Sequence, residues 1–133
     1  MDGPRVLVVE DDEDVRGLLS AHLRRLGCVV EQVATGAAGL AAARAVPPDL
    51  VLLDVLLPDL DGRDVARELA EDPATADRPV VLTSMLDAQD LAGLPVAGVL
   101  RKPFTRRDLA RVLASVQGRV GRAAADHDPG SRS

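Results

Sequence analysis

The sequence predicts an α/β fold in which five parallel strands form one doubly wound sheet, with helices on both of its faces. Short apolar runs alternate five times with stretches of helical periodicity, which is the pattern of that fold. The central stretch, DLVLLDVLLPDLDG over 49–62, is apolar enough for a strand buried on both faces. One carboxylate, Asp54, interrupts it. Because burying an unpaired carboxylate is costly, we expect Asp54 at the end of this strand.

The first strand is predicted over 5–9, RVLVV, and it leads into an acidic run over 10–14. Carboxylates interact favourably with a helix N-terminus, so the later members of this run, Asp12 to Asp14, suit a helix cap and first turn. The apolar side of the helix that follows is expected to consist of Val15, Leu18, Leu19, Leu23 and Leu26. Gly27 should end this helix, and a second strand is predicted over 28–33.

Thr35 should cap a second helix that runs to about residue 45, because a Pro-Pro pair follows and prevents its continuation. The central strand comes next, and the third helix is predicted from 62 to about 71. VVLTS over 80–84 is the fourth strand, and it ends in two hydroxyl residues. These elements continue the strand–helix alternation through the middle of the chain.

The stretch MLDAQDLAGLPVAG, over 85–98, offers at most two turns of helix before Gly93 and Pro95 break it. The fourth helix should therefore be short or irregular. A short fifth strand is predicted over 96–100, followed by the loop that begins at Lys102. These expectations complete a five-stranded sheet.

Thr105 should cap a last helix, whose apolar face ends near residue 117. After that point the sequence loses its periodicity, and 118–133 is expected to be a disordered tail. With 1–4 as an N-terminal extension, the chain is predicted to contain one domain over 5–117, which is long enough to bury a core.

The bulk composition excludes several classes of function. A net charge of −5 and a single aromatic residue, Phe104, argue against nucleic acid as a direct partner. The lone cysteine, Cys28, cannot form an internal disulfide and is expected to be a buried thiol. No signal peptide is recognisable and no apolar run approaches the length that spans a bilayer, so we expect a cytoplasmic protein without a membrane partner.

The chemistry is expected at one edge of the sheet. The flavodoxin-like strand order, 2-1-3-4-5, brings Glu10 and Asp11, after strand one, beside Asp54 at the end of strand three. Three crowded carboxylates repel one another but suit a hard divalent cation, and Mg²⁺ fits best. A strand-four hydroxyl and Lys102, the only lysine beside fifteen arginines, reach the same edge and could bind phosphoryl oxygens. The set would support phosphoryl transfer to Asp54.

Four motifs in order carry a resemblance to a known family: VVEDD after strand one, LLDVLLPDLDG around Asp54, the hydroxyl that ends strand four, and RKPF after strand five. The chain resembles a response-regulator receiver domain of the two-component signalling families over residues 5 to about 117. The resemblance implies that Asp54 is the phosphoacceptor and that Glu10, Asp11 and the backbone carbonyl of Leu56 hold Mg²⁺ with it. It also implies that Lys102 binds the phosphoryl group and precedes a cis peptide bond.

The chain departs from the usual receiver pattern at several positions. Both Thr83 and Ser84 could be the switch hydroxyl, and spacing from Asp54 favours Ser84. Met85 then stands where the family usually has a small residue, and Val99 where many receivers have an aromatic. The segment between Ser84 and Lys102 is also about one turn shorter than usual.

Two further positions concern the lifetime of the phosphorylated state. Leu56 and Leu86 lie where polar side chains of some receivers orient the water that attacks the phosphoryl group. Leucine cannot orient water, so we expect a long-lived phosphoaspartate.

We expect a stand-alone receiver, with no output domain. The resemblance implies a signalling domain rather than an enzyme, which takes its phosphoryl group from a histidine kinase or a histidine phosphotransfer protein. It would signal through protein contacts to an unknown target, and a homodimer is a further state that such receivers adopt. The alternative is a pseudo-receiver that acts as a phosphorylation-independent interaction module. An aspartate-nucleophile phosphatase would need a second aspartate at the position of Leu56, and a flavin-binding electron carrier would need aromatic residues that this chain lacks.

Overall fold

The computed structural model describes the backbone of residues 3–126 and the side chains up to residue 116. Its five strands are β1 (Arg5–Val9), β2 (Val29–Val33), β3 (Leu50–Asp54), β4 (Val80–Ser84) and β5 (Gly98–Arg101). Its helices are α1 (Glu13–Arg25), α2 (Gly36–Ala45), α3 (Gly62–Glu71), the 3₁₀ helix η1 (Ala88–Leu91) and α4 (Arg106–Asp126). All strands pair in parallel in the order β2-β1-β3-β4-β5, which confirms the predicted topology.

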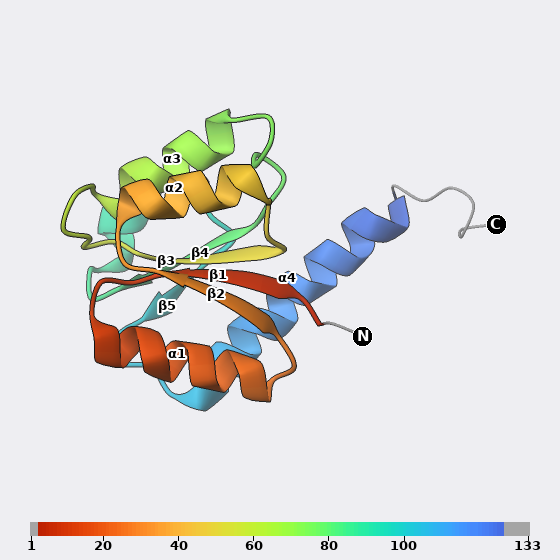
Figure 1. Cartoon of the computed structure of the whole chain (residues 1–133), viewed down its shortest axis with the longest axis horizontal. Coiled ribbons are helices and arrows are strands. Elements are labelled where there is room, and N and C mark those ends of the chain that lie inside the picture. The colour runs from red at the N-terminus through yellow and green to blue at the C-terminus, as the bar shows by residue number, and fades with distance from the viewer. Residues whose placement is uncertain (1–2, 127–133) are drawn as a thin grey trace.

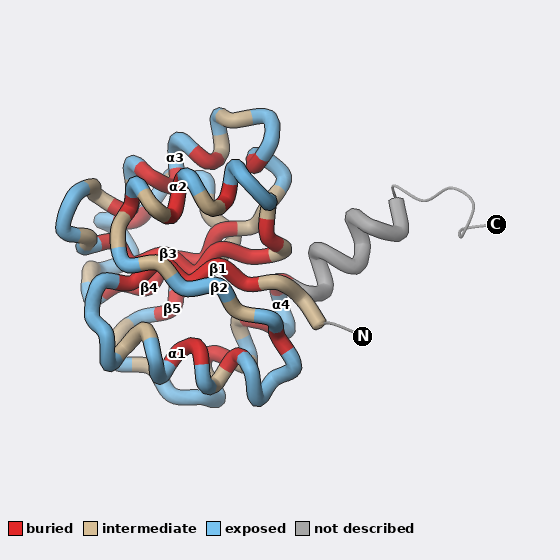
Figure 2. The backbone as a smooth tube through the Cα atoms, in the orientation of Figure 1, coloured by how far each residue is buried: buried red, intermediate tan, exposed pale blue. Residues whose placement is uncertain are grey.

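The sheet lies between two layers of helices. Figure 1 shows α2 and α3 on one face and α1 with the first turns of α4 on the other. Each face has its own apolar core, and β3, whose five residues are all buried, contributes to both. Figure 2 shows this burial concentrated along the central strands. The double burial explains why the sequence of β3 is a nearly continuous apolar run that does not alternate with polar residues.

The helix starts follow the predicted caps. The Asp12 side chain accepts hydrogen bonds from the backbone N–H groups of Asp14 and Val15, and the Thr35 hydroxyl accepts one from Ala38. Thr105 caps α4 by accepting from the N–H of Asp108. These side chains satisfy donors that have no partner within the helix, so each cap fixes where its helix begins.

Two residues of the predicted apolar side of the first helix are exposed. Leu19 and Leu23 are buried against the sheet, but 53% of Leu18 is exposed, and so is 39% of Leu26, which lies at the C-cap of α1. Adjacent helical residues point about 100° apart, and the buried stripe of α1 is too narrow to include Leu18.

The region between β4 and β5 confirms the expected irregular fourth helix, because η1 is a single 3₁₀ turn. β5 begins at Gly98, two residues later than predicted. The N–H of Val96 bonds to the carbonyl of Leu94 in a tight turn, so the chain joins the sheet only from Ala97, whose N–H bonds to the carbonyl of Val80.

The last helix is longer than the sequence indicates. α4 continues to Asp126, whereas its periodicity predicts an end near residue 117. Arginine and alanine are frequent beyond that point, and both favour helix. The remainder of the predicted tail, 127–133, lies outside the described residues. Across the described part of the chain, no helix combines the length and apolar character needed to cross a membrane.

Candidate functional site

Three carboxylates meet at the carboxyl edge of the sheet, as the topology predicts. Glu10 and Asp11 directly follow β1, and Asp54 is the last residue of β3. These strands are neighbours, with Val9 opposite Leu53. Each of the three side chains offers an oxygen within 4.8 Å of the other two. Glu10 and Asp54 are buried and Asp11 is exposed, so the cluster has a buried floor and an open rim.

Lys102 is the cation that the structure places in this cluster. Its Nζ lies 3.1 Å from Oε1 of Glu10 and 3.3 Å from Oδ2 of Asp54. Burial lowers the pKa of Lys102, but the two carboxylates outweigh it and hold that pKa above its ordinary value. Burial also raises the pKa of Glu10 to about 7, although the N–H of Asp12 bonds to its carboxylate and lowers that pKa in part. The site is therefore short of positive charge.

The donor set fits Mg²⁺. The oxygens of Glu10, Asp11 and Asp54 are hard ligands close enough together to share one ion. A divalent cation would balance the negative charge that the Lys102 ammonium leaves uncompensated. Leu56 belongs to the same site through its backbone, because its N–H donates to Oδ1 of Asp54 at 3.3 Å. Its side chain is 67% exposed at the mouth.

Two features of this site were not predicted from the sequence. The guanidinium of Arg16, on α1, donates to the carbonyl of Glu10 at 2.9 Å and to that of Asp11 at 3.4 Å, so it holds the acidic loop from the helix side. At Gly62, a Cβ would collide with the backbone oxygen of Asp54, so the start of α3 can approach the end of β3 only with glycine there. The acidic character of the loop indicates a need for a cation, but no pattern singles out Arg16.

The two candidate hydroxyls at the end of β4 differ in their surroundings. Thr83 lies opposite Asp54 in the strand register, is buried, and has no hydrogen-bond partner for its hydroxyl among the described residues. The Ser84 hydroxyl accepts a 2.8 Å bond from the N–H of Leu86, which leaves its own hydrogen free to donate. The carbonyl of Ser84 also accepts from the N–H of Lys102, so Ser84 adjoins the ammonium-bearing loop.

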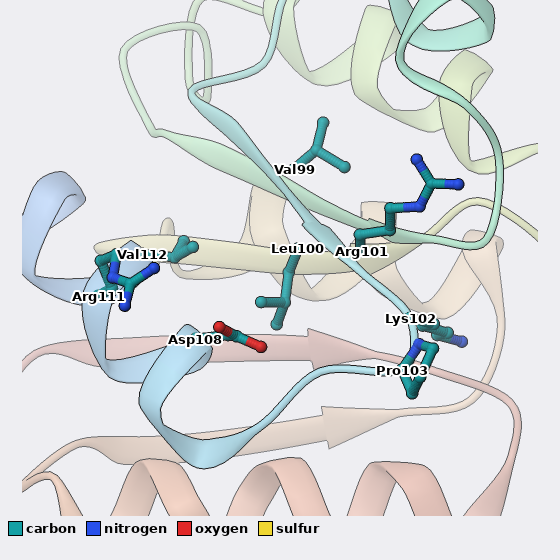
Figure 3. Close-up of a pocket in the computed structure, with 8 residues that line it drawn as sticks. All are labelled: Val99, Leu100, Arg101, Lys102, Pro103, Asp108, Arg111 and Val112. Atoms are coloured by element: carbon teal, nitrogen blue, oxygen red, sulfur yellow. The ribbon is translucent and has the colours of Figure 1, made fainter.

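A groove of about 480 Å³ lies beside the site, between β5 and the first turns of α4. Figure 3 shows its lining, in which Lys102 and Pro103 stand at one end of the groove. The peptide bond between these two residues is cis, as the resemblance implies.

Val99, on β5, is 39% exposed and Met85, after β4, is 70% exposed. The two unusual positions in the sequence are therefore both surface positions.

Comparison with known proteins identifies the family. The family model "Response regulator receiver domain" matches residues 6–114. The chain is 37% identical over 123 residues to the DNA-binding dual master transcriptional regulator RpaA of Synechocystis, and these cover 90% of this chain and 50% of that protein. It is 36% identical over 126 residues to the probable transcriptional regulatory protein TcrX of Mycobacterium tuberculosis, covering 91% of this chain and 53% of that protein. The chain spans about half the length of these relatives.

Solved structures agree with this assignment. The chemotaxis response regulator CheY4 of Vibrio cholerae superimposes with a TM-score of 0.80 at 25% identity, covering 85% of this chain and 98% of that chain. The signal receiver domain of a signal transduction histidine kinase from Syntrophus aciditrophicus gives a TM-score of 0.80 at 28% identity, with coverages of 87% and 92%. Both the sequence and the fold thus point to one signalling family.

Proposed function

This chain belongs to the response regulator receiver domain family, and we propose that it accepts a phosphoryl group on Asp54 from a histidine kinase or a histidine phosphotransfer protein, in a Mg²⁺-dependent reaction. The observation that carries the proposal is the convergence of Glu10, Asp11 and Asp54 within 4.8 Å, with Nζ of Lys102 at 3.3 Å from the Asp54 carboxylate. Carboxylates, an ammonium and a strand-end hydroxyl are the groups that phosphoryl transfer to an aspartate requires.

In the proposed reaction, an Asp54 carboxylate oxygen attacks the phosphorus of the donor. The new P–O bond forms as the P–N bond of a phosphohistidine breaks, and the imidazole leaves with the bond's electron pair. The Lys102 ammonium, now 3.3 Å from Oδ2, binds a phosphoryl oxygen and offsets the added charge. The N–H of Leu56 orients Asp54 through its bond to Oδ1.

The metal would be held by Glu10, Asp11, Asp54 and the backbone carbonyl of Leu56. When bound, Mg²⁺ neutralises charge on the phosphoryl oxygens and so reduces the repulsion between the phosphoryl group and the carboxylates of the site.

We assign the switch hydroxyl to Ser84. Its hydrogen is free to donate, its backbone adjoins Lys102, and it lies one residue nearer the strand end than Thr83. A phosphoryl group on Asp54 extends beyond the strand end, which favours the outermost hydroxyl. The side chain that follows, Met85, is exposed.

The output is proposed to be contact with another protein in the cytoplasm. DNA binding is stated in the name of the relative RpaA, and this chain aligns with half of that protein. The described surface offers no aromatic stacking platform, and the whole chain carries a net charge of −5. We therefore propose no direct nucleic-acid contact for the receiver itself.

The test is to locate the phosphoryl group. The chain is incubated with acetyl phosphate and Mg²⁺ and then reduced with borohydride, which converts an acyl phosphate to an alcohol. Peptide masses should place the reduced residue at Asp54 and show none in Asp54→Asn. A reduced residue elsewhere would contradict the assignment. No reduced residue in a sample shown to be folded would favour the phosphorylation-independent interaction module.

A further inference from the structure

We propose that Asp59 is a positioning residue that braces the two metal-binding loops against each other through α2. One loop follows β1 and carries Glu10 and Asp11, and the other follows β3 and carries Leu56. The inference rests on the proposed function, because it concerns how well the same site holds Mg²⁺. Its basis is a set of contacts that lie outside the site itself.

The Asp59 carboxylate spans from the β3–α3 loop to the start of α2. Its Oδ1 accepts a 2.8 Å bond from the N–H of Gly36, and its Oδ2 accepts a 3.0 Å bond from the N–H of Ala37. The N–H of Ala38, next in the helix, bonds to the Thr35 hydroxyl. Asp59 therefore accepts from the two N–H groups at the helix start that the Thr35 cap does not satisfy. The bonds from Ala37 and Gly36 lower the pKa of Asp59, which keeps the carboxylate charged at neutral pH.

The same helix is seated on the strand that leads to the other loop. A Cβ at Gly39 would lie 2.9 Å from Cγ2 of Val9, so α2 packs directly on the residue before Glu10. Leu40 and Ala43 bury the rest of this face against the sheet. One helix therefore contacts Val9, the strand residue just before the first loop, and is bonded to the second loop through Asp59.

Leu56 lies three residues before Asp59, and its N–H bonds to the Asp54 carboxylate of the site. The base of the loop is closed by a 2.7 Å bond from the N–H of Gly62 to the carbonyl of Val55. Asp59 adds a second anchor at the far end of the loop. Without it, the loop keeps the packing of Leu60 against Gly36 but loses its hydrogen bonds to α2, so the Leu56 backbone is held less firmly relative to Glu10. Loss of support behind a metal ligand typically weakens metal binding by about 10–100-fold, and for an exposed anchor we expect about tenfold.

The experiment compares Asp59→Asn with Asp64→Asn. Both remove one carboxylate charge from the same region, but Asp64 is exposed on α3, and among the described residues its one ion pair is with Arg67, three residues away. Asparagine keeps the shape of Asp59 and presents an NH₂ group to one of the two N–H donors. The Mg²⁺ dissociation constant is measured by calorimetry on the unphosphorylated protein, with amide hydrogen exchange at Gly36 and Ala37. The dependence of phosphorylation on Mg²⁺ concentration is recorded with acetyl phosphate as donor.

Asp59→Asn should raise the Mg²⁺ dissociation constant about tenfold and speed exchange at Gly36 and Ala37, with the phosphorylation rate restored at saturating Mg²⁺. Asp64→Asn should bind Mg²⁺ as the wild type does. Asp59→Ser keeps one acceptor oxygen without asparagine's NH₂ group, so its Mg²⁺ dissociation constant should lie between those of Asp59→Asn and the wild type. It gives a second variant if asparagine disturbs folding. Faster exchange with an unchanged dissociation constant would reduce Asp59 to a plain helix cap and overturn the inference. If the wild type itself bound no Mg²⁺, the proposed function would fail first.

Discussion

Replacing Asp11 with asparagine should stabilise the metal-free protein, because Asp11 contributes repulsion and no ion pair within the described residues. At 4.8 Å, two unit charges repel by about 0.9 kcal/mol at the permittivity of water and by about 3.5 kcal/mol at an effective permittivity of 20. Asp11 is exposed, so the lower value applies to its repulsion from Glu10 and Asp54. The two repulsions together amount to about 1.7 kcal/mol, and because salt screens exposed charges we expect the free energy of unfolding to rise by about 1 kcal/mol.

The assay is urea unfolding with EDTA and with Mg²⁺, at a pH about one unit above the Glu10 pKa of about 7, so that Glu10 is charged. Wild type should gain about 1.4 kcal/mol at a Mg²⁺ concentration of ten times the dissociation constant, and Asp11→Asn much less. Asp14→Asn is the matched control. It removes the same charge from the first turn of α1, where a carboxylate is favourable, and should cost about 0.3–1 kcal/mol. If Asp11→Asn were destabilising, or if Mg²⁺ stabilised it as much as wild type, the reasoning would be refuted.

Three further predictions use other groups of the site. The pKa of Glu10 is about 7 in the folded protein and ordinarily 4.5, so between these two pH values the folded metal-free chain holds a proton that the unfolded chain releases. The free energy of unfolding should therefore fall by up to about 3 kcal/mol as pH rises from 4.5 to above 7. Urea unfolding of Glu10→Gln should show no such pH dependence. Thr83→Val should raise the free energy of unfolding by about 1 kcal/mol and leave the phosphorylation rate unchanged, whereas Ser84→Ala should lower that rate; the reverse pattern would make Thr83 the switch hydroxyl. The phosphoaspartate should be long-lived and Leu56→Asn, at a side chain 67% exposed, should shorten its half-life; loss from wild type within seconds of donor removal would contradict this.

The residues of the site that were predictable from the sequence are those at strand ends. Glu10, Asp11 and Asp54 interrupt or follow apolar runs, and the parallel topology brings such positions to one edge. Lys102 follows the last run in the same way. The strand register then decides how close each pair lies, and the 3.1 Å and 3.3 Å contacts of Lys102 follow from that placement.

The supporting residues could not be predicted in this way. Arg16 and Asp59 act on backbone groups, and backbone donors and acceptors leave no trace in the sequence of the segment that carries them. Asp59 bonds to residues 22 and 23 positions away, across a change of element. The exposure of Leu18 has a related cause, because the width of a buried helix stripe depends on how closely the helix lies on the sheet.

The most direct test of the central claim is the intact mass of the chain after incubation with acetyl phosphate and Mg²⁺. Parallel samples contain EDTA in place of Mg²⁺ or carry Asp54→Asn. The account predicts a gain of one phosphoryl group in the wild type with Mg²⁺ and no gain in either control. An adduct that forms equally well with EDTA, or that survives Asp54→Asn, would contradict it.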